Sequence, residues 1–302
     1  MSIKIGIFSS QEVYTRSLID VINEKGISHG IKAEFIILPP VSLEEICPYR
    51  VIIDRISHVV KFIRSYLKHA FLTGTSIINN PFLFSYDDKF YNGTLAKKIG
   101  ISVPKTVILP SRDYSYDFRP GDLHNLSYPV DWEGICNYTG LPAILKPVCG
   151  YGWRRIYKVR NIDELLKVYN QTGEELMILQ EFIEFENYLR CFVIGKKHVL
   201  PVKYDPHRRR YIVSHKPIND NLRDRIVEDC IKINKTLGYD MNTVEFAIKD
   251  GIPYSIDFMN PVPDCNPEVI QEEYFTWVVD KLAEVAIEYG VNSRDEHPIR
   301  HV

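Results

Sequence analysis

The sequence lacks the features that would place the chain in a membrane, outside the cell or on a nucleic acid. No run of eighteen apolar residues exists, because the nearest one, 59–72, is interrupted by charged side chains. The N-terminus MSIKIGIFSS has no apolar signal region with a cleavage site. The 6 cysteines are scattered without a CxxC pair, which favours reduced thiols and a cytoplasmic location. With 37 basic and 39 acidic residues, the net charge of −2 gives no reason to expect a nucleic-acid or membrane partner.

Motifs that identify several common enzyme classes are also missing. The chain contains neither GxxxxGK[ST], which cradles phosphates in P-loop proteins, nor GxGxxG, which marks dinucleotide-binding folds. Its 9 histidines include no HxH or HExxH pair, and no nucleophile elbow is present. P-loop nucleotide binding, Rossmann-type redox chemistry, histidine-based zinc chemistry and serine hydrolysis are therefore not expected.

What is present is a chain of 302 residues, 45% of them hydrophobic, which is enough for about two globular domains. The first eighty residues alternate short apolar strands with helical patterns, which predicts a parallel α/β domain over 1–80. Beyond it the pattern changes to α+β. We expect a central helical and irregular domain over 81–140, which opens with a helix capped by Ser85 or Asp87, a small lobe over 141–205 and a C-terminal lobe over 206–302.

The most informative segment is NTVEFAIKDGIPYSIDFMNP at 242–261. A three-residue loop at 250–252 would give a hairpin with one apolar face and would place Glu245 opposite Asp257 on the other. Facing carboxylates repel each other, and a divalent cation held by both, with the amide of Asn260 just beyond, would offset the repulsion. A solvated face neutralised by Lys or Arg explains the pattern equally well, so both interpretations stay open.

A second segment suited to an anion begins at Lys146. This residue ends an apolar strand and is followed by a short loop that contains Gly150 and Gly152. An ammonium group and the backbone N–H groups of a flexible loop suit phosphate oxygens. Arg154 and Arg155 directly after the loop also fit an anionic ligand, although a plain turn before a solvated basic strand is the alternative.

In chain order, these segments resemble the ATP-grasp superfamily of carboxylate–amine ligases, of the glutathione synthetase and ribosomal-protein glutamate ligase type. The similarity covers residues 79–261 and rests on five short motifs. They are Asp88-Lys89 with GISVP at 100–104, ILKP at 144–147, LQEFI at 179–183, RCFVIG at 190–195 and the hairpin at 245–261. The resemblance implies an N-terminal parallel α/β domain followed by a two-lobed ATP-grasp fold.

The resemblance also implies roles in binding ATP. Lys89 and Lys146 would hold the phosphates, and the loop from Gly150 to Gly152 would close over them. The adenine ring would be bound by residues 181–183, which follow Leu179-Gln180. Glu181 and Ile183 would contribute backbone groups, and Phe182 would lie beside the ring. Glu186 would bind the ribose hydroxyls, with Asn187 as the alternative.

The same resemblance implies a metal site and a set of catalytic side chains. Glu245, Asp257 and Asn260 would bind Mg²⁺, which Mn²⁺ can replace. Arg190 and Lys203 would face the phosphates or the acyl-phosphate. Arg210 is a further catalytic candidate, as part of a basic run that would clamp an anionic substrate or the γ-phosphate of ATP. The reaction would be phosphoryl transfer from ATP to a carboxylate, followed by attack of an amine or a thiol on the acyl-phosphate.

The substrates implied by the resemblance are a small carboxylic acid and an amino acid or peptide, and a homodimer is compatible with it. Two other functions stay open: a nucleotide-binding module of this fold that has lost ligation, and a small-molecule kinase that stops after phosphoryl transfer. Two departures from the family pattern leave room for them. Thr243 stands where peptide-forming relatives carry an arginine, and Asp257 stands three residues before Asn260 instead of two, which a β-bulge would absorb.

Two basic features are left with two interpretations each. The run Arg208-Arg209-Arg210 is either a solvated turn or a clamp for an anion. Arg55 follows the third N-terminal strand, where open α/β sheets bind ligands. It would either bind a substrate carboxylate or form a surface ion pair.

Overall fold

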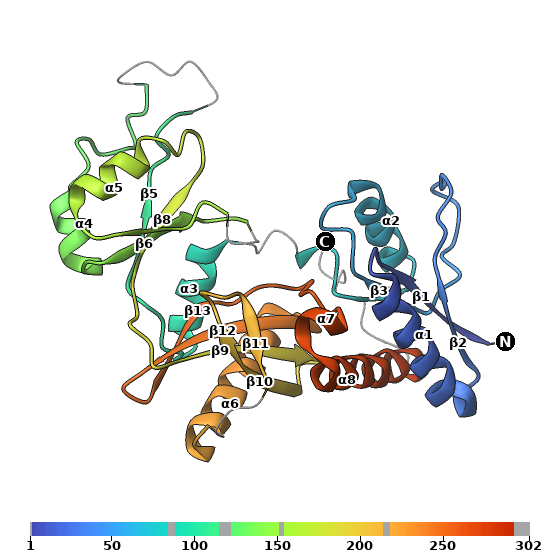
Figure 1. Cartoon of the computed structure of the whole chain (residues 1–302). Coiled ribbons are helices and arrows are strands. Elements are labelled where there is room, and N and C mark those ends of the chain that lie inside the picture. Colours follow the sequence, from blue (N-terminus) through green and yellow to red (C-terminus); the bar gives the residue numbers. More distant parts are fainter. Residues whose placement is uncertain (1, 84–87, 115–121, 151–153, 214–217, 293–302) are drawn as a thin grey trace. The chain divides into compact units, whose positions relative to one another are not determined.

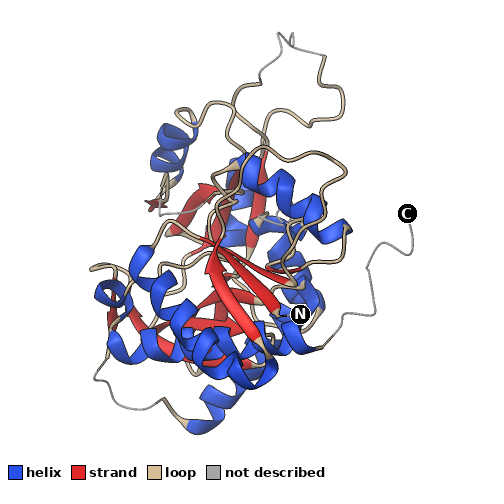
Figure 2. Ribbon diagram, turned by 90° about the vertical axis from the view of Figure 1, so that its right-hand side faces the viewer, coloured by secondary structure: helices blue, strands red, loops and turns tan. Residues whose placement is uncertain are grey.

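The described part of the chain forms three β-sheets flanked by helices, shown as red strands and blue helices in Figure 2. The computed structural model describes residues 2–83, 88–114, 122–150, 154–213 and 218–292 (Figure 1). The chain divides into two units. The first comprises Met1–Ser85, Leu189–Val244 and Met259–Val302, and the second comprises Tyr86–Tyr188 and Glu245–Phe258. The four domain ranges expected from the sequence stay a prediction.

The N-terminal part of the first unit is a parallel sheet, as predicted, and its strand order is β2-β1-β3-β4. Phe8, Ile52 and Ile77 of its strands pack against the helix between β3 and β4, and Ile3 and Ile5 lie beside the C-terminal helix near Gly290. The elements are β1 (Ile3–Phe8), α1 (Glu12–Gly26), η1 (Ile27–His29), β2 (Ile31–Phe35), β3 (Val51–Asp54), α2 (Lys61–Leu72), β4 (Ser76–Ile78) and α8 (Glu272–Val291).

A five-stranded sheet in the order β11-β10-β9-β12-β13 follows. The division between the two units passes through β9 and β12. Within the first unit, Asn219 caps the long helix α6, which ends at Gly238 in the left-handed region. The elements are β9 (Asn187–Ile194), β10 (His198–Asp205), β11 (Arg210–Ile212), α6 (Asp220–Leu237), β12 (Met241–Lys249), β13 (Ile252–Asp257) and α7 (Pro267–Ile270).

The second unit contains an antiparallel sheet in the order β5-β8-β6-β7. Its helix α3 is capped by Asp88, whose carboxylate accepts from the Tyr91 N–H at 2.8 Å, so the predicted cap at Ser85 or Asp87 is wrong. The elements are α3 (Lys89–Lys98), β5 (Thr106–Leu109), α4 (Trp132–Thr139), β6 (Ala143–Pro147), β7 (Tyr157–Val159), α5 (Ile162–Tyr169) and β8 (Met177–Glu181).

The hairpin of β12 and β13 pairs Glu245 with Asp257 as predicted, but its loop and most of its register differ. Lys249 pairs with Ile252, so the loop has two residues, Asp250 and Gly251, with φ of 51° and 71°. Positive φ at both positions is typical of the two-residue turn that Asp-Gly favours. A bulge beside Glu245 inserts Ile256 and restores the pairing of the two carboxylates.

Two glycines of the second unit predict opposite effects on stability. Gly251 has φ of +71°, so Gly251→Ala strains the turn and is expected to destabilise by about 1–2 kcal/mol. Gly93 lies inside α3 with open space at its Cβ position, so Gly93→Ala is expected to stabilise by about 0.5–1 kcal/mol. Urea denaturation of both variants checks the pair, and equal effects of the two substitutions would contradict the assigned turn.

Two further properties bear on the sequence expectations. All 6 cysteines are free thiols, and Cys149 is exposed. In the part of the chain that the structure describes, no helix combines the length and the apolar character needed to span a membrane.

Candidate functional site

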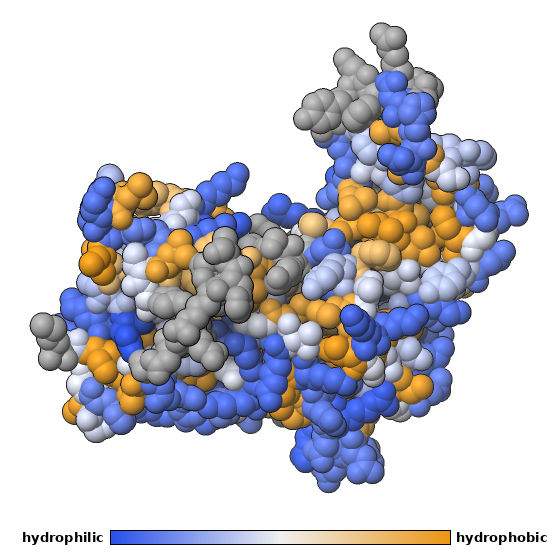
Figure 3. All heavy atoms as spheres, turned by 180° about the vertical axis from the view of Figure 1, so that it is seen from behind, coloured by the Kyte–Doolittle hydropathy of each residue, from blue (hydrophilic) through white to orange (hydrophobic). Residues whose placement is uncertain are grey.

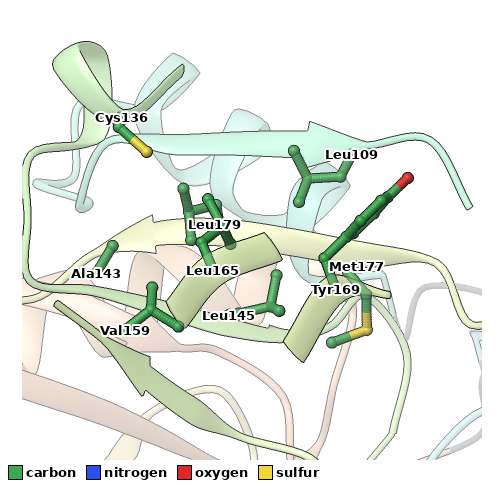
Figure 4. Packing of buried hydrophobic residues seen from close by; sticks show 9 residues of the cluster. All are labelled: Leu109, Cys136, Ala143, Leu145, Val159, Leu165, Tyr169, Met177 and Leu179. Atoms are coloured by element: carbon green, nitrogen blue, oxygen red, sulfur yellow. The ribbon is translucent and has the colours of Figure 1, made fainter. Parts of the chain in front are cut away.

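The sheet of the second unit has one face in a hydrophobic core and another that carries polar side chains. Figure 4 shows the core face, where Leu145 and Leu179 pack with Val159 beneath α4 and α5. Because neighbouring residues of a strand point to opposite faces, Ile144 and Lys146 of β6 lie on the other face. The lobe that contains this sheet presents gathered hydrophobic side chains at its surface (upper right in Figure 3).

Lys146 is the central charged residue of that second face. It is 6% exposed, and its Nζ donates to the Ile256 carbonyl of the hairpin bulge at 3.0 Å. Burial lowers the pKa of Lys146, the carboxylates of Asp257 and Glu245 oppose this shift, and Lys89 adds to it. The two predicted phosphate-binding lysines and the two predicted metal-binding carboxylates therefore interact electrostatically within one unit.

The lowered pKa of Lys146 predicts a pH-dependent stability. Between its lowered pKa and the ordinary value of 10.5, the unfolded chain binds a proton at this lysine more readily than the folded chain does. The free energy of unfolding contributed by this group therefore rises with pH across that window. Lys146→Met removes the effect, so its stability advantage over the wild type should shrink as pH rises from neutral toward 10.5. Thermal unfolding of both chains at several pH values checks this, and a difference independent of pH would contradict it.

Lys89 is fixed at the start of α3, close to the glycine loop. Its backbone N–H donates to the Val148 carbonyl at 3.0 Å, and its Nζ donates to the Gly150 carbonyl at 2.7 Å. Gly150 has φ of +123°, a conformation that favours glycine, so the carbonyl can face the ammonium group. Gly152 lies outside the described residues, so the predicted closure over phosphates stays a prediction.

The predicted adenine-binding linker follows β8. The Glu181 N–H donates to the Lys105 carbonyl at 2.8 Å, and its carboxylate accepts from the Lys105 N–H at 3.1 Å. Because both the main-chain N–H and the carboxylate of Glu181 are bonded to Lys105, the predicted role of the Glu181 main chain in binding adenine stays a prediction. Ile183 is buried, and the ring of Phe182 carries the Lys158 ammonium 3.4 Å from its centroid.

Glu186 joins the linker to the hairpin turn, a contact that the sequence did not predict. Its N–H donates to the Ile248 carbonyl at 2.8 Å, and one carboxylate oxygen accepts from the Asp250 N–H at 3.3 Å. The side chain is exposed, so binding of a ribose hydroxyl by the second oxygen stays a prediction.

Glu245 and Asp257 face each other on neighbouring strands. Glu245 is 7% exposed and accepts a hydrogen bond from the hydroxyl of Tyr188, which sequence analysis missed. Tyr188 stands two residues before Arg190, and only its alternation with that residue along β9 could have indicated it.

Carboxylate oxygens from two strands fit a hard divalent cation such as Mg²⁺. Among the described residues no group of three or more His, Cys, Asp and Glu could hold a metal, so a cation at these two carboxylates would need ligands of another kind as well.

Asn260 belongs to the first unit, where its main chain is held on both sides. Its N–H donates to Asn242 Oδ1 at 2.8 Å, and its carbonyl accepts from the Thr243 N–H at 3.1 Å. The bulge that was expected between Asp257 and Asn260 lies before Asp257 instead, at Ile256. The three-residue spacing from Asp257 to Asn260 therefore contains no bulge and follows directly after the end of β13.

The three predicted catalytic side chains do not share a face of their sheet. Arg190 pairs with Val202, whereas Lys203 pairs with Leu189 and Ile212. Paired residues lie on one face, so Arg190 and Lys203 point to opposite faces. Arg210, two residues before Ile212, shares the Lys203 face. Arg190 and Lys203 therefore cannot contact one phosphate group from the same face, and the catalytic roles of Lys203 and Arg210 stay predictions.

Arg190 is held by aromatic rings on its own face. Its guanidinium carbon lies 4.5 Å from the ring centroid of Tyr204 and 5.9 Å from that of Tyr211. One of its nitrogens reaches the Tyr211 hydroxyl at 3.5 Å. Arg210 is exposed opposite Asp205, and the backbone N–H groups of His207 and Arg208 both donate to Asp205 at 3.0 Å. The arginine run is thus a solvated turn, and Arg190 is the better-positioned cation.

Comparison with solved structures identifies the architecture. The ATP-grasp ligase PsnB, solved with a precursor variant, Mg and ADP, superposes with a TM-score of 0.63 at 13% identity, over 96% of this chain and 99% of that one. The chain has the ATP-grasp fold. D-alanine–D-alanine ligase from Bacillus anthracis, solved with ATP, shares this fold with a TM-score of 0.61 at 15% identity, over 96% and 98% of the two chains.

Comparison with curated sequences finds only partial similarities, and one of them is to a ligase. No protein-family model matches the chain. The coenzyme γ-F420-2:α-L-glutamate ligase of Methanococcus maripaludis is 27% identical over 105 residues, which is 35% of this chain. The match spans about a third (32%) of that relative's length.

Proposed function

We propose that the protein is an ATP-dependent ligase that joins a carboxylate to an amine through an acyl-phosphate. The observation that carries the proposal is the buried Lys146, whose Nζ donates to the carbonyl of Ile256 next to the paired carboxylates Glu245 and Asp257, inside a unit of an ATP-grasp fold. A buried ammonium beside paired carboxylates is the charge arrangement that a metal-bound nucleotide phosphate needs. The lysine would contact phosphate oxygens, and the carboxylates would face the metal.

In the proposed reaction, a carboxylate oxygen of the acid attacks the γ-phosphorus of ATP and the bond to the β-phosphate oxygen breaks, which gives an acyl-phosphate and ADP. An amine then attacks the acyl carbon, and inorganic phosphate leaves as the amide forms. Mg²⁺ held by Glu245, Asp257 and Asn260 would neutralise charge on the phosphates. Lys89 and Lys146 would orient the phosphates, and Arg190 would stabilise charge on the acyl-phosphate.

An amino acid or a peptide is the substrate class that we propose for one or both sites. PsnB was solved with a precursor, and one of the matching curated relatives is a glutamate ligase, which supports this class. The same match supports a closer relation to the glutathione synthetase and ribosomal-protein glutamate ligase type. The homodimer and the cytoplasmic location predicted from the sequence are not needed for this activity and stay predictions.

Trapping with hydroxylamine tests the proposal without knowledge of the amine. The protein is incubated with ATP, Mg²⁺, hydroxylamine and pools of amino acids or short peptides. We expect ADP formation that depends on one acid pool, together with an acyl hydroxamate of that acid. A phosphorylated product that is stable to hydroxylamine would favour the kinase, and no ADP with any pool would favour a module that has lost ligation.

A further inference from the structure

The side chain of Asn79, directly after β4, uses all of its hydrogen-bonding capacity on two distant chain segments. Its Oδ1 accepts from the N–H groups of Asp240 and Met241, both at 2.8 Å. Its Nδ2 donates to the Met241 carbonyl at 2.8 Å and to the Pro261 carbonyl at 3.3 Å. A side-chain amide offers two donors and one oxygen that can accept twice. No carboxylate or hydroxyl could make the same four bonds.

Arg55, at the end of the neighbouring strand β3, binds the same region. It is 3% exposed, and it donates to the Pro263 carbonyl, to Cys265 Sγ at 3.6 Å and to Met241 Sδ at 3.3 Å. Its guanidinium also lies 5.1 Å from the ring centroid of Tyr14. No carboxylate of the described residues lies within ion-pair distance, so the surface ion pair considered for Arg55 is wrong.

Together these contacts fix the two segments that enter and leave the hairpin. Residues 240–241 precede the β12 carboxylate, and residues 261–265 follow the β13 carboxylate. Asn260 lies at the centre, with its N–H on Asn242 and its carbonyl on Thr243. The carboxyl edge of a parallel sheet commonly binds a ligand. In this protein, the residues at that edge, Arg55 after β3 and Asn79 after β4, bind segments 240–241 and 261–265 of the same chain.

We propose that Asn79 is a positioning residue for the metal ligand Asn260, and that Arg55 extends the same clamp to 263–265. This inference rests on the proposed function, because the role of Asn260 is part of it. By fixing Met241 and Pro261 with one amide, Asn79 sets the register between the two segments and so the place of the Asn260 side chain. Residues that orient metal ligands in this way influence metal affinity strongly.

The test compares Asn79→Asp with Asn80→Asp. The first substitution keeps the acceptor but turns both donors into an oxygen that faces two carbonyl groups. The second is a matched control with the same chemical change one residue away, because Asn80 only accepts, from the Phe82 N–H at 2.9 Å. Binding of Mn²⁺ in the presence of AMP-PNP is measured by electron paramagnetic resonance. AMP-PNP affinity in EDTA and amide hydrogen exchange are measured in parallel.

For Asn79→Asp we expect Mn²⁺ affinity to fall by about tenfold or more, while AMP-PNP affinity in EDTA stays within about twofold of wild type. Exchange should accelerate at 240–243 and 259–263, and Asn80→Asp should match the wild type in every measurement. Unchanged Mn²⁺ affinity, or an equal fall of metal and metal-free nucleotide affinity, would overturn the positioning role. A wild-type chain that binds no Mn²⁺ with AMP-PNP would overturn the proposed function itself. If Asn79→Asp does not fold, Asn79→Ser is measured against the same outcomes.

Discussion

Replacing Lys146 with methionine is expected to lower ATP-dependent turnover by about 10²–10³-fold while the fold stays intact, as removal of one preorganised charge-stabilising donor does elsewhere. The side chain lies on the polar face of its sheet, and among the described residues its hydrogen-bond partner is the Ile256 carbonyl, which a neutral methionine leaves without this bond. Methionine keeps most of the buried volume and removes the charge whose burial is unfavourable. The measurement is ADP release at saturating substrates, combined with circular dichroism and thermal unfolding.

The control for this experiment is Lys167→Met. Lys167 lies exposed on α5 of the same unit, so the variant loses the same charge away from the polar face. Its turnover should equal that of the wild type. Near-normal turnover of Lys146→Met, or an equal loss in both variants, would contradict the assignment of Lys146 to the phosphates.

Asp257→Asn is expected to have the second large effect, a loss of about 10³-fold in Mg²⁺-dependent turnover, because charge stabilisation by a bound metal is worth several kcal/mol. In the absence of metal the same change should raise the melting temperature, since it removes the repulsion between Asp257 and Glu245. Opposite signs for activity and metal-free stability distinguish a ligand from a structural residue. Turnover against Mg²⁺ concentration and thermal unfolding in EDTA measure the two effects.

Asp250→Asn is the matched control, because it makes the same substitution at the exposed tip of the same hairpin. Asp250 has φ of 51°, a conformation that asparagine also adopts readily. Turnover and metal-free stability should both stay close to wild type. If Asp257→Asn behaves like this control, the two carboxylates form a solvated polar face and not a metal site.

The candidate site shows why some residues could be placed from the sequence and others could not. Lys146 and Glu181 sit at the ends of short apolar strands, so local patterns were enough to place them in the secondary structure. The pairing of Glu245 with Asp257 was predicted correctly, but from a three-residue loop that the hairpin does not have. A two-residue turn shifts the register by one position, and the bulge at Ile256 shifts it back, so the expected three-residue loop gave the same pair.

Errors arose where the answer depends on register or on distant contacts. Whether Lys203 shares a face with Arg190 depends on the pairing of β9 with β10. A shift of this pairing by one residue would move the side chains of one strand to the other face of the sheet. Asn79 and Arg55 reach partners more than 160 positions away in the sequence. No local periodicity encodes such contacts, and the burial of Arg55 could not be inferred from its place after a strand.

Calorimetric titration of the wild-type chain with AMP-PNP, with Mg²⁺ and with EDTA, tests the central claim most directly. The same titrations are made with a guanine analogue, Lys146→Met and Asp257→Asn. We expect binding that is specific for the adenine nucleotide and is strengthened by Mg²⁺, that weakens strongly in Lys146→Met, and that loses its dependence on Mg²⁺ in Asp257→Asn. No binding by the wild type, or equal binding of both nucleotides with and without Mg²⁺, would contradict the assignment of this site to metal-bound ATP.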